Sequence, residues 1–310
     1  MHLPRKWIDR RFYEYFSTNV TPIFARHKTP VLVYQMGKVG SSSLRNSLFR
    51  SPAPETDLVL MSHEFFPIRN RVLDKLAIGE KERDAVLREI QHDRHVFNQF
   101  SFRKKIAWRL REKFYTEKIY NNYVRMGRPL KVITLVREPI ANNISMFFQI
   151  LDHYTGEKHE KANWTTDRLI QLFLDRYIHT RPLTWFDAEL RPMLGIDVYE
   201  YAYPKDRGHL SIEKDNIELL VLKCELSNRE KESAVKAFLG IDEFKIIPGN
   251  LSSGKLYAQQ YKEFRSRIIF PESLLDEVYG SRYALHFYDE ADLVRFHAHW
   301  SRLDSRANAQ

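Results

Sequence analysis

The residues best suited to hold an anion lie in the stretch VLVYQMGKVGSSSL at 31–44. Its four apolar or aromatic residues predict a short buried strand, and a helical pattern begins at the serines. The turn between them contains Gly37, Lys38 and Gly40. Backbone N–H groups at a helix start point toward a bound anion, and small residues let it approach closely. We therefore expect an anion-binding loop whose contacts come from Lys38, Val39, Gly40, Ser41, Ser42 and Ser43.

The loop departs from the ATP-binding pattern G-x-x-x-x-G-K-[ST]. Leu32 stands at the position of the first glycine, and Val39 stands where a hydroxyl would meet Mg²⁺. Lys38 also precedes Gly40 instead of following it. An ATP-dependent small-molecule kinase is thus disfavoured, although it stays an alternative.

A second anion-binding pattern follows the strand LKVITLV at 130–136. Arg137 comes directly after this strand, Pro139 suits the first turn of a helix, and Ser145 follows eight residues after the arginine. A guanidinium offers a planar fork that matches a phosphate dianion. Arg137 is therefore a candidate contact for an anion, and Ser145 offers a hydroxyl about two turns along the same helix.

Acid–base residues end another expected strand, at 56–62, in the stretch LMSHEFFP. A histidine or a glutamate can take up a proton as a general base. His63 has the better reference pKa for that work near neutral pH, and Glu64 is its rival. Adjacent residues at a strand end point to opposite faces, so one of the two is expected to face the ligand.

The order Lys-x-Gly-Ser-Ser, followed by a strand, Arg-Glu-Pro and a serine, resembles the sulfotransferases that use 3′-phosphoadenosine 5′-phosphosulfate (PAPS). The loop resembles those of bacterial capsular polysaccharide synthesis proteins, and the chain as a whole also resembles carbohydrate sulfotransferases. The departures are Met36-Gly37 where many members have proline before the lysine, and Met61 where cytosolic members have lysine.

The resemblance implies the roles of the site residues. The 31–44 loop would bind the 5′-phosphosulfate, with Lys38 also stabilising the leaving phosphate. Arg137 and Ser145 would bind the 3′-phosphate, His63 or Glu64 would act as base, and no metal would be needed. The implied acceptor is a hydroxyl of a carbohydrate, glycan precursor or lipid-linked sugar.

Three further stretches carry weaker resemblances to the same family. The segment 183–208 contains W-F-x-x-E followed by G-I-D-V-Y, and its aromatic residues favour a core role. The strand ELLVLKCEL ends near Glu225, an acidic residue that the family also has there. The segment 249–264 resembles a loop that closes over the adenosine and 3′-phosphate, with Lys255 as its charged contact.

Strands expected at 31–36, 56–62, 130–136 and 217–226 alternate with helices, including one at 228–239. This order predicts an α/β fold with a central parallel sheet. The resemblance implies three layers, similar to P-loop NTPases. We expect one domain over 1–310 with a helical insertion at about 71–128.

Composition indicates the kind of ligand and the cellular compartment to expect. The 310 residues carry a formal charge of +9, which favours anionic ligands. The single cysteine, Cys224, and the lack of a signal-peptide or membrane-spanning run predict a cytoplasmic protein. The segment 103–131 has ten Lys or Arg against two Glu, so a non-catalytic nucleic-acid-binding module is a further alternative.

Overall fold

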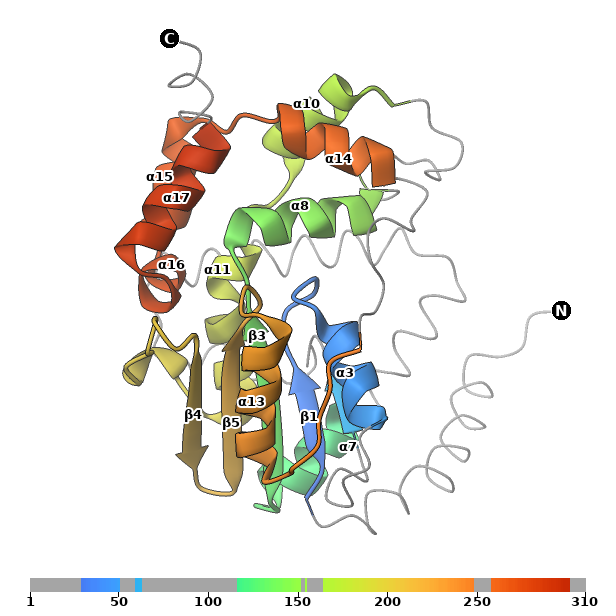
Figure 1. Ribbon diagram of the computed structural model, residues 1–310, viewed down its shortest axis with the longest axis vertical. Helices are drawn as coiled ribbons and strands as arrows, with labels where there is room; N and C mark the ends of the chain where they lie inside the picture. The colour runs from blue at the N-terminus through green and yellow to red at the C-terminus, as the bar shows by residue number, and fades with distance from the viewer. Residues whose placement is uncertain are drawn as a thin grey trace, which may run out of the picture.

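A computed structural model describes residues 29–50, 59–62, 116–151, 154, 164–247 and 258–301. Within these ranges the chain forms a mixed α/β fold, with one sheet and helices on both of its faces (Figure 1). Of the helical insertion expected at 71–128, only residues 116–128 are described, and they are largely helical, with α7 at Glu117–Ile119 and a π-helical segment, η4, at Tyr120–Arg125.

The sheet has five strands in the order β2-β1-β3-β5-β4. They are β1 (Val31–Tyr34), β2 (Val59–Ser62), β3 (Leu130–Val136), β4 (His209–Lys214) and β5 (Ile217–Lys223). The pairs β1–β2, β1–β3 and β3–β5 are parallel. Strands β3 and β5 are almost continuously apolar because helices cover both faces of a parallel sheet.

Strand β4 makes the sheet mixed, where the sequence predicted a parallel one. It pairs with β5 in antiparallel register, with His209 opposite Leu222 and Lys214 opposite Ile217. The connecting turn is tight, and Asp215 takes a left-handed backbone conformation there, with φ at 53°. The chain therefore returns directly as a hairpin instead of crossing over through a helix.

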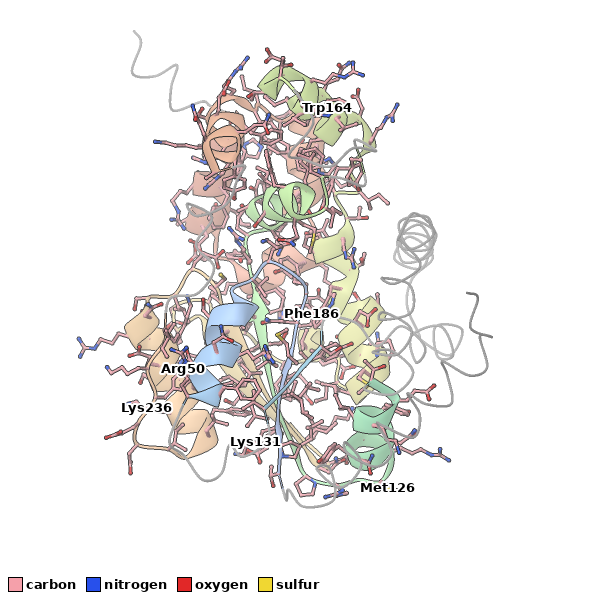
Figure 2. All side chains as sticks on the ribbon, turned by 90° about the vertical axis from the view of Figure 1, so that its right-hand side faces the viewer. Arg50, Met126, Lys131, Trp164, Phe186 and Lys236 are labelled. Carbon is pink, nitrogen blue, oxygen red and sulfur yellow. The ribbon has the colours of Figure 1, made fainter. Side chains whose placement is uncertain are left out.

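Two groups of helices cover the sheet. Helices α3 (Ser41–Phe49) and α13 (Asn228–Leu239) lie on one face. The view in Figure 2 shows the π-helical segment η4 and the helices near 181–194 on the opposite face. The latter are α11 (Arg181–Trp185), the π-helical segment η6 (Phe186–Leu190) and α12 (Arg191–Leu194).

A layer of helices lies beyond the carboxyl ends of the parallel strands (Figure 1). It contains α8 (Pro139–Gln149), α10 (Thr166–Arg176), α14 (Ala258–Arg267), α15 (Glu272–Tyr279), α16 (Arg282–Phe287) and α17 (Glu290–Ser301). One apolar cluster surrounds the sheet, and a second joins α8, α10, α14, α15 and α17. Helix α8 follows β3 directly, so its first turn lies where the two clusters meet.

Candidate functional site

Most of the predicted site residues follow the carboxyl ends of the parallel strands. The 35–40 loop follows β1, Arg137 follows β3, and Cys224 and Glu225 follow β5. Strand β1 lies between β2 and β3. After β1 the chain therefore forms β2 on one side of β1 and later forms β3 on its other side. Such a reversal of strand order opens a crevice at the carboxyl edge of an α/β sheet, where ligands commonly bind.

The 35–40 loop is held against the first residues after β3. The guanidinium of Arg137 donates a hydrogen bond to the carbonyl of Lys38, at 2.6 Å. The amide of Asn142, on α8, donates to the carbonyl of Gly37, at 2.9 Å. The Lys38 ammonium donates to the side chain of Gln149, also on α8, at 3.3 Å. The two predicted phosphate-binding stretches are thus in direct contact, and we name this arrangement the anion cradle: residues 37–43, Arg137 and the face of α8 with Asn142, Ser145 and Gln149.

Backbone conformation shapes the anion cradle. Lys38 is left-handed, with φ at 68°, and Gly40 has φ at 88°. Gly40 occupies the N-cap position of α3 and offers no side chain to cap it. The first N–H groups of a helix have no partner within the helix, so those of α3 are donors that suit an anion. The loop also lies close to α8 at Gly37, where a Cβ would be 2.3 Å from the Cε of Met146, the flexible end of that side chain.

Ser145 lies half-buried on α8. It is three residues after Asn142 and four before Gln149, so all three share the helix face that meets the 35–40 loop. The structure therefore places Ser145 on the α8 face that meets the 35–40 loop, and its contact with a phosphate stays a prediction.

Glu138 anchors the start of α8. It is almost fully buried, and its carboxylate accepts hydrogen bonds from the N–H groups of Ile140 (2.7 Å) and Ala141 (2.6 Å) and from the Tyr279 hydroxyl (2.8 Å). Burial raises the pKa of this carboxyl, and the hydrogen bonds oppose that shift. Glu138 is thus a helix cap that fixes the direction in which α8 leaves the sheet.

The two residues that follow β5, Cys224 and Glu225, lie beside the anion cradle. The Sγ of Cys224 lies 3.8 Å from the position that a Cβ on Gly40 would take, and burial raises the pKa of its thiol. Glu225 accepts hydrogen bonds from the Glu138 N–H (2.8 Å) and the Tyr288 hydroxyl (3.3 Å). The acidic residue singled out at the end of this strand therefore bonds to the backbone next to Arg137.

Several predicted site residues lie outside the described ranges. These are His63, Glu64 and Lys255, together with the side chains of Ser41 and Ser42. The described part of β2 ends at Ser62, which pairs with Tyr34 of β1. His63 and Glu64 thus follow β2 in sequence, and β2 pairs with β1, the strand that leads into the 35–40 loop.

The structure shows one contact that sequence reasoning missed. Tyr34, the last residue of β1, donates a hydrogen bond to Glu189 at 3.1 Å, and its ring meets that of Trp185 edge to face. Glu189 is buried within η6, a π-helical segment, and such segments are often found at functional sites. The W-F-x-x-E spacing was a signal for this stretch, but the sequence alone did not indicate that its glutamate meets β1.

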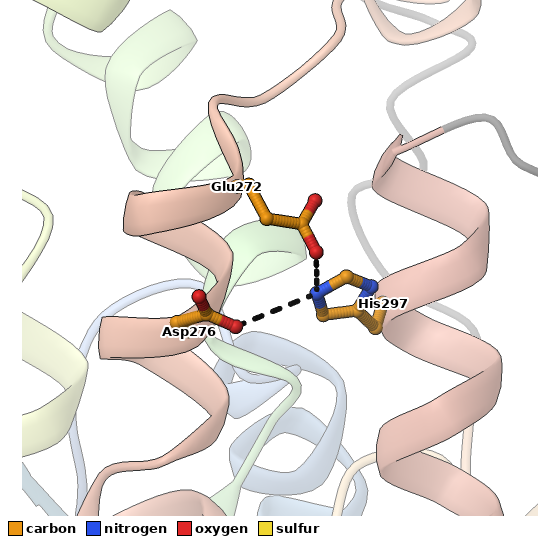
Figure 3. A group of neighbouring side chains, drawn as sticks. All are labelled: Glu272, Asp276 and His297. Carbon is orange, nitrogen blue, oxygen red and sulfur yellow. Dashed lines mark ion pairs between the residues drawn. The ribbon is translucent and has the colours of Figure 1, made fainter.

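A separate group of ligand-type side chains lies on α15 and α17 (Figure 3). The Nε2 of His297 is 3.1 Å from Glu272 and 3.9 Å from Asp276. The carboxylates are largely exposed, and the contacts form an ion pair between two packed helices when the imidazole is protonated. This group joins α15 to α17.

Fold and site together define a mixed α/β protein with a candidate anion-binding site at a strand-order reversal. Residues 159–289 match the model of a family described as "Putative capsular polysaccharide synthesis protein". The match covers α10 through α16 and leaves out the 35–40 loop and Arg137. Searches of curated proteins and of solved structures found no match. In the described part of the chain, no helix is both long and apolar enough to cross a membrane.

Proposed function

We propose that this protein is a PAPS-dependent sulfotransferase with a P-loop-like fold, acting on a hydroxyl of a carbohydrate or glycan precursor. The observation that carries the proposal is the hydrogen bond from Arg137 to the carbonyl of Lys38, which joins two anion-binding stretches about one hundred residues apart. A nucleotide with separate 5′ and 3′ phosphates needs two such stretches side by side. The partial family match supports a role in polysaccharide synthesis.

The residues present fit the two anionic ends of PAPS. Lys38 and the first N–H groups of α3 would take the 5′-phosphosulfate, since both favour a negative charge. Arg137 and Ser145 would take the 3′-phosphate. The Arg137 guanidinium already donates to a carbonyl through NH1 and has further N–H groups that can meet a phosphate.

The proposed reaction is an in-line transfer. The acceptor oxygen forms a bond to sulfur as the bond between sulfur and the bridging phosphate oxygen breaks. The acceptor proton goes to His63 or Glu64, and 3′,5′-ADP leaves. Lys38 stabilises the charge that develops on the bridging oxygen.

Nucleotide binding tests the assignment. Arg137→Ala is expected to weaken 3′,5′-ADP about tenfold to a hundredfold, because a charge-assisted contact is worth about 1.5–3 kcal/mol. It should affect 5′-AMP less, since that ligand lacks the 3′-phosphate and is affected only through the lost hydrogen bond to the Lys38 carbonyl. Lys38→Ala should weaken both ligands alike. Isothermal titration calorimetry gives each Kd, with Arg128→Ala, near the amino end of β3, as the matched control.

Equal weakening of both ligands by Arg137→Ala, in a variant with native circular dichroism, would refute the 3′-phosphate assignment. Incubation with labelled PAPS and a panel of glycans, lipid-linked sugars and small alcohols then tests transfer itself. Tight binding of ATP–Mg²⁺ with none of 3′,5′-ADP would replace the proposal with a kinase.

The nucleic-acid alternative has a specific observation against it. Within the described part of the basic segment, Lys131 pairs with Glu218 at 2.8 Å and Arg128 packs over the ring of Tyr123. Tight binding of random-sequence DNA without binding of 3′,5′-ADP would favour that alternative.

A further inference from the structure

The backbone of Arg137 is held by a single buried hydroxyl from a distant helix. Tyr283, on α16, accepts a hydrogen bond from the Arg137 N–H at 3.0 Å. The same hydroxyl donates to the Arg137 carbonyl at 2.9 Å. One oxygen atom therefore bonds the two peptide groups on either side of the same Cα.

This contact begins where the strand ladder stops. Val136 is the last residue of β3 and pairs with Lys223 of β5. The Val136 carbonyl still accepts a hydrogen bond from the Cys224 N–H, at 2.7 Å. At Arg137 the Tyr283 hydroxyl supplies the donor and acceptor that a neighbouring strand would otherwise supply. Fixing the N–H and the carbonyl together restricts φ and ψ, and thereby the direction in which the arginine side chain leaves the backbone.

The surroundings of Tyr283 keep this arrangement in place. The residue is fully buried, and its ring packs against those of Phe186 and Phe287, with centroids 6.2 and 5.0 Å away. Burial raises the pKa of the hydroxyl well above its ordinary value, so it stays protonated and can donate. Because the site is buried, loss of the hydroxyl would leave two backbone groups of Arg137 without this partner.

Neighbouring contacts extend the same support by one residue. Glu225 holds the Glu138 N–H, and Tyr279 holds the Glu138 carboxylate. Tyr283, Tyr279 and Glu225 all lie within residues 159–289, whereas Arg137 does not. The segment that matches the family thus meets the anion cradle by bonding to the chain around Arg137.

We infer that Tyr283 is a positioning residue that aims the Arg137 guanidinium at the 3′-phosphate, an inference that rests on the proposed function. A preorganised charged group binds more tightly than one that must be ordered on binding. Tyr283 does not touch the ligand in this scheme. It acts only through Arg137, and its effect should be specific to ligands that carry a 3′-phosphate.

The test compares Tyr283→Phe with Tyr123→Phe, which removes a buried tyrosine hydroxyl in η4, near the amino end of β3. Calorimetry measures the Kd of 3′,5′-ADP and of 5′-AMP for each protein. For Tyr283→Phe we expect the Kd of 3′,5′-ADP to rise about threefold to tenfold, the effect of one or two ordinary hydrogen bonds. The Kd of 5′-AMP should stay within about twofold of the wild-type value, because 5′-AMP has no 3′-phosphate for Arg137 to bind. Tyr123→Phe should leave the ratio of the two Kd values unchanged.

The outcomes separate the inference from the proposed function. If the wild type prefers 3′,5′-ADP but Tyr283→Phe keeps the wild-type ratio, the inference alone is overturned. If the wild type shows no preference, the 3′-phosphate assignment and the inference both fall. In an Arg137→Ala background, Tyr283→Phe should no longer change the affinity for 3′,5′-ADP.

A measurement on the wild type keeps the test independent of whether Tyr283→Phe folds. Hydrogen exchange followed by NMR should show the Arg137 amide protected like that of Val136, although it lies beyond the strand ladder. Rapid exchange of the Arg137 amide would overturn the inference.

Discussion

His179 makes the stability of the helical layer depend on pH. It lies between α10 and α11, where its ring packs edge to face against Phe173 at 4.8 Å and Tyr177 at 5.3 Å. Its Nε2 is 3.2 Å from the Phe173 carbonyl, and its own carbonyl accepts from Asn143 on α8 at 2.9 Å. Burial lowers the pKa of the imidazole from 6.5 to about 4, although the hydrogen bond to Phe173 opposes the shift.

The lowered pKa sets the direction of the pH effect. The folded state holds His179 neutral, while the unfolded state takes up a proton below about pH 6.5. The stability linked to this group is therefore complete above pH 6.5 and is lost as the pH falls toward 4. The gap between the two pKa values corresponds to about 3 kcal/mol by pH 4.

Urea unfolding at pH 7 and pH 4 measures this loss. The wild type should lose about 3 kcal/mol more unfolding free energy over this range than His179→Gln, which cannot titrate. Buried carboxylates and other histidines contribute to the pH dependence of both proteins. The effect of His179 is therefore the difference between the two losses of unfolding free energy. His299→Gln, at an exposed position on α17, is the control for replacing an imidazole with glutamine. Equal pH dependence in wild type and His179→Gln would refute the reasoning.

Two further predictions concern stability. Gly40→Ala should lower the unfolding free energy by about 1–2 kcal/mol, because an alanine is strained at φ 88°; an unchanged urea midpoint would contradict this. Lys223→Ala should cost roughly 2–3 kcal/mol, since it breaks a largely buried ion pair with Asp292 at 3.1 Å. Lys131→Ala, which breaks a more exposed pair with Glu218, should cost about 1 kcal/mol or less and serves as the comparison in the same urea titrations.

Four strands could be predicted from sequence because each is a short, nearly continuous apolar run. The predicted runs at 31–36 and 217–226 were too long, since the strands end at Tyr34 and Lys223. Strand β4 was missed because, among the residues of HLSIEK, only Ile212 is fully buried. Its pairing depends on the hairpin with β5, which local composition does not reveal.

The contact between the 35–40 loop and Arg137 was predictable in outline, because the carboxyl ends of parallel strands meet at one edge of a sheet. The role of Tyr283 was not. Tyr279, Tyr283 and Tyr288 are spaced four and five residues apart, which in sequence looks like an ordinary core stripe. Only the packing of α15 and α16 against the strand ends shows which backbone and carboxylate groups their hydroxyls reach.

The pairing of β1 with β3 also constrains how the chain folds during synthesis. Val31 lies opposite Lys131, so β1 waits for about one hundred residues before its second neighbour, β3, exists. At typical rates of translation this takes roughly 5–20 s. Until then β1 has only the four-residue β2 beside it, and a two-stranded ribbon is marginal in water. An apolar VLVY segment exposed for that long is a target for chaperones, and the nascent chain should be most prone to aggregate before β3 leaves the ribosome.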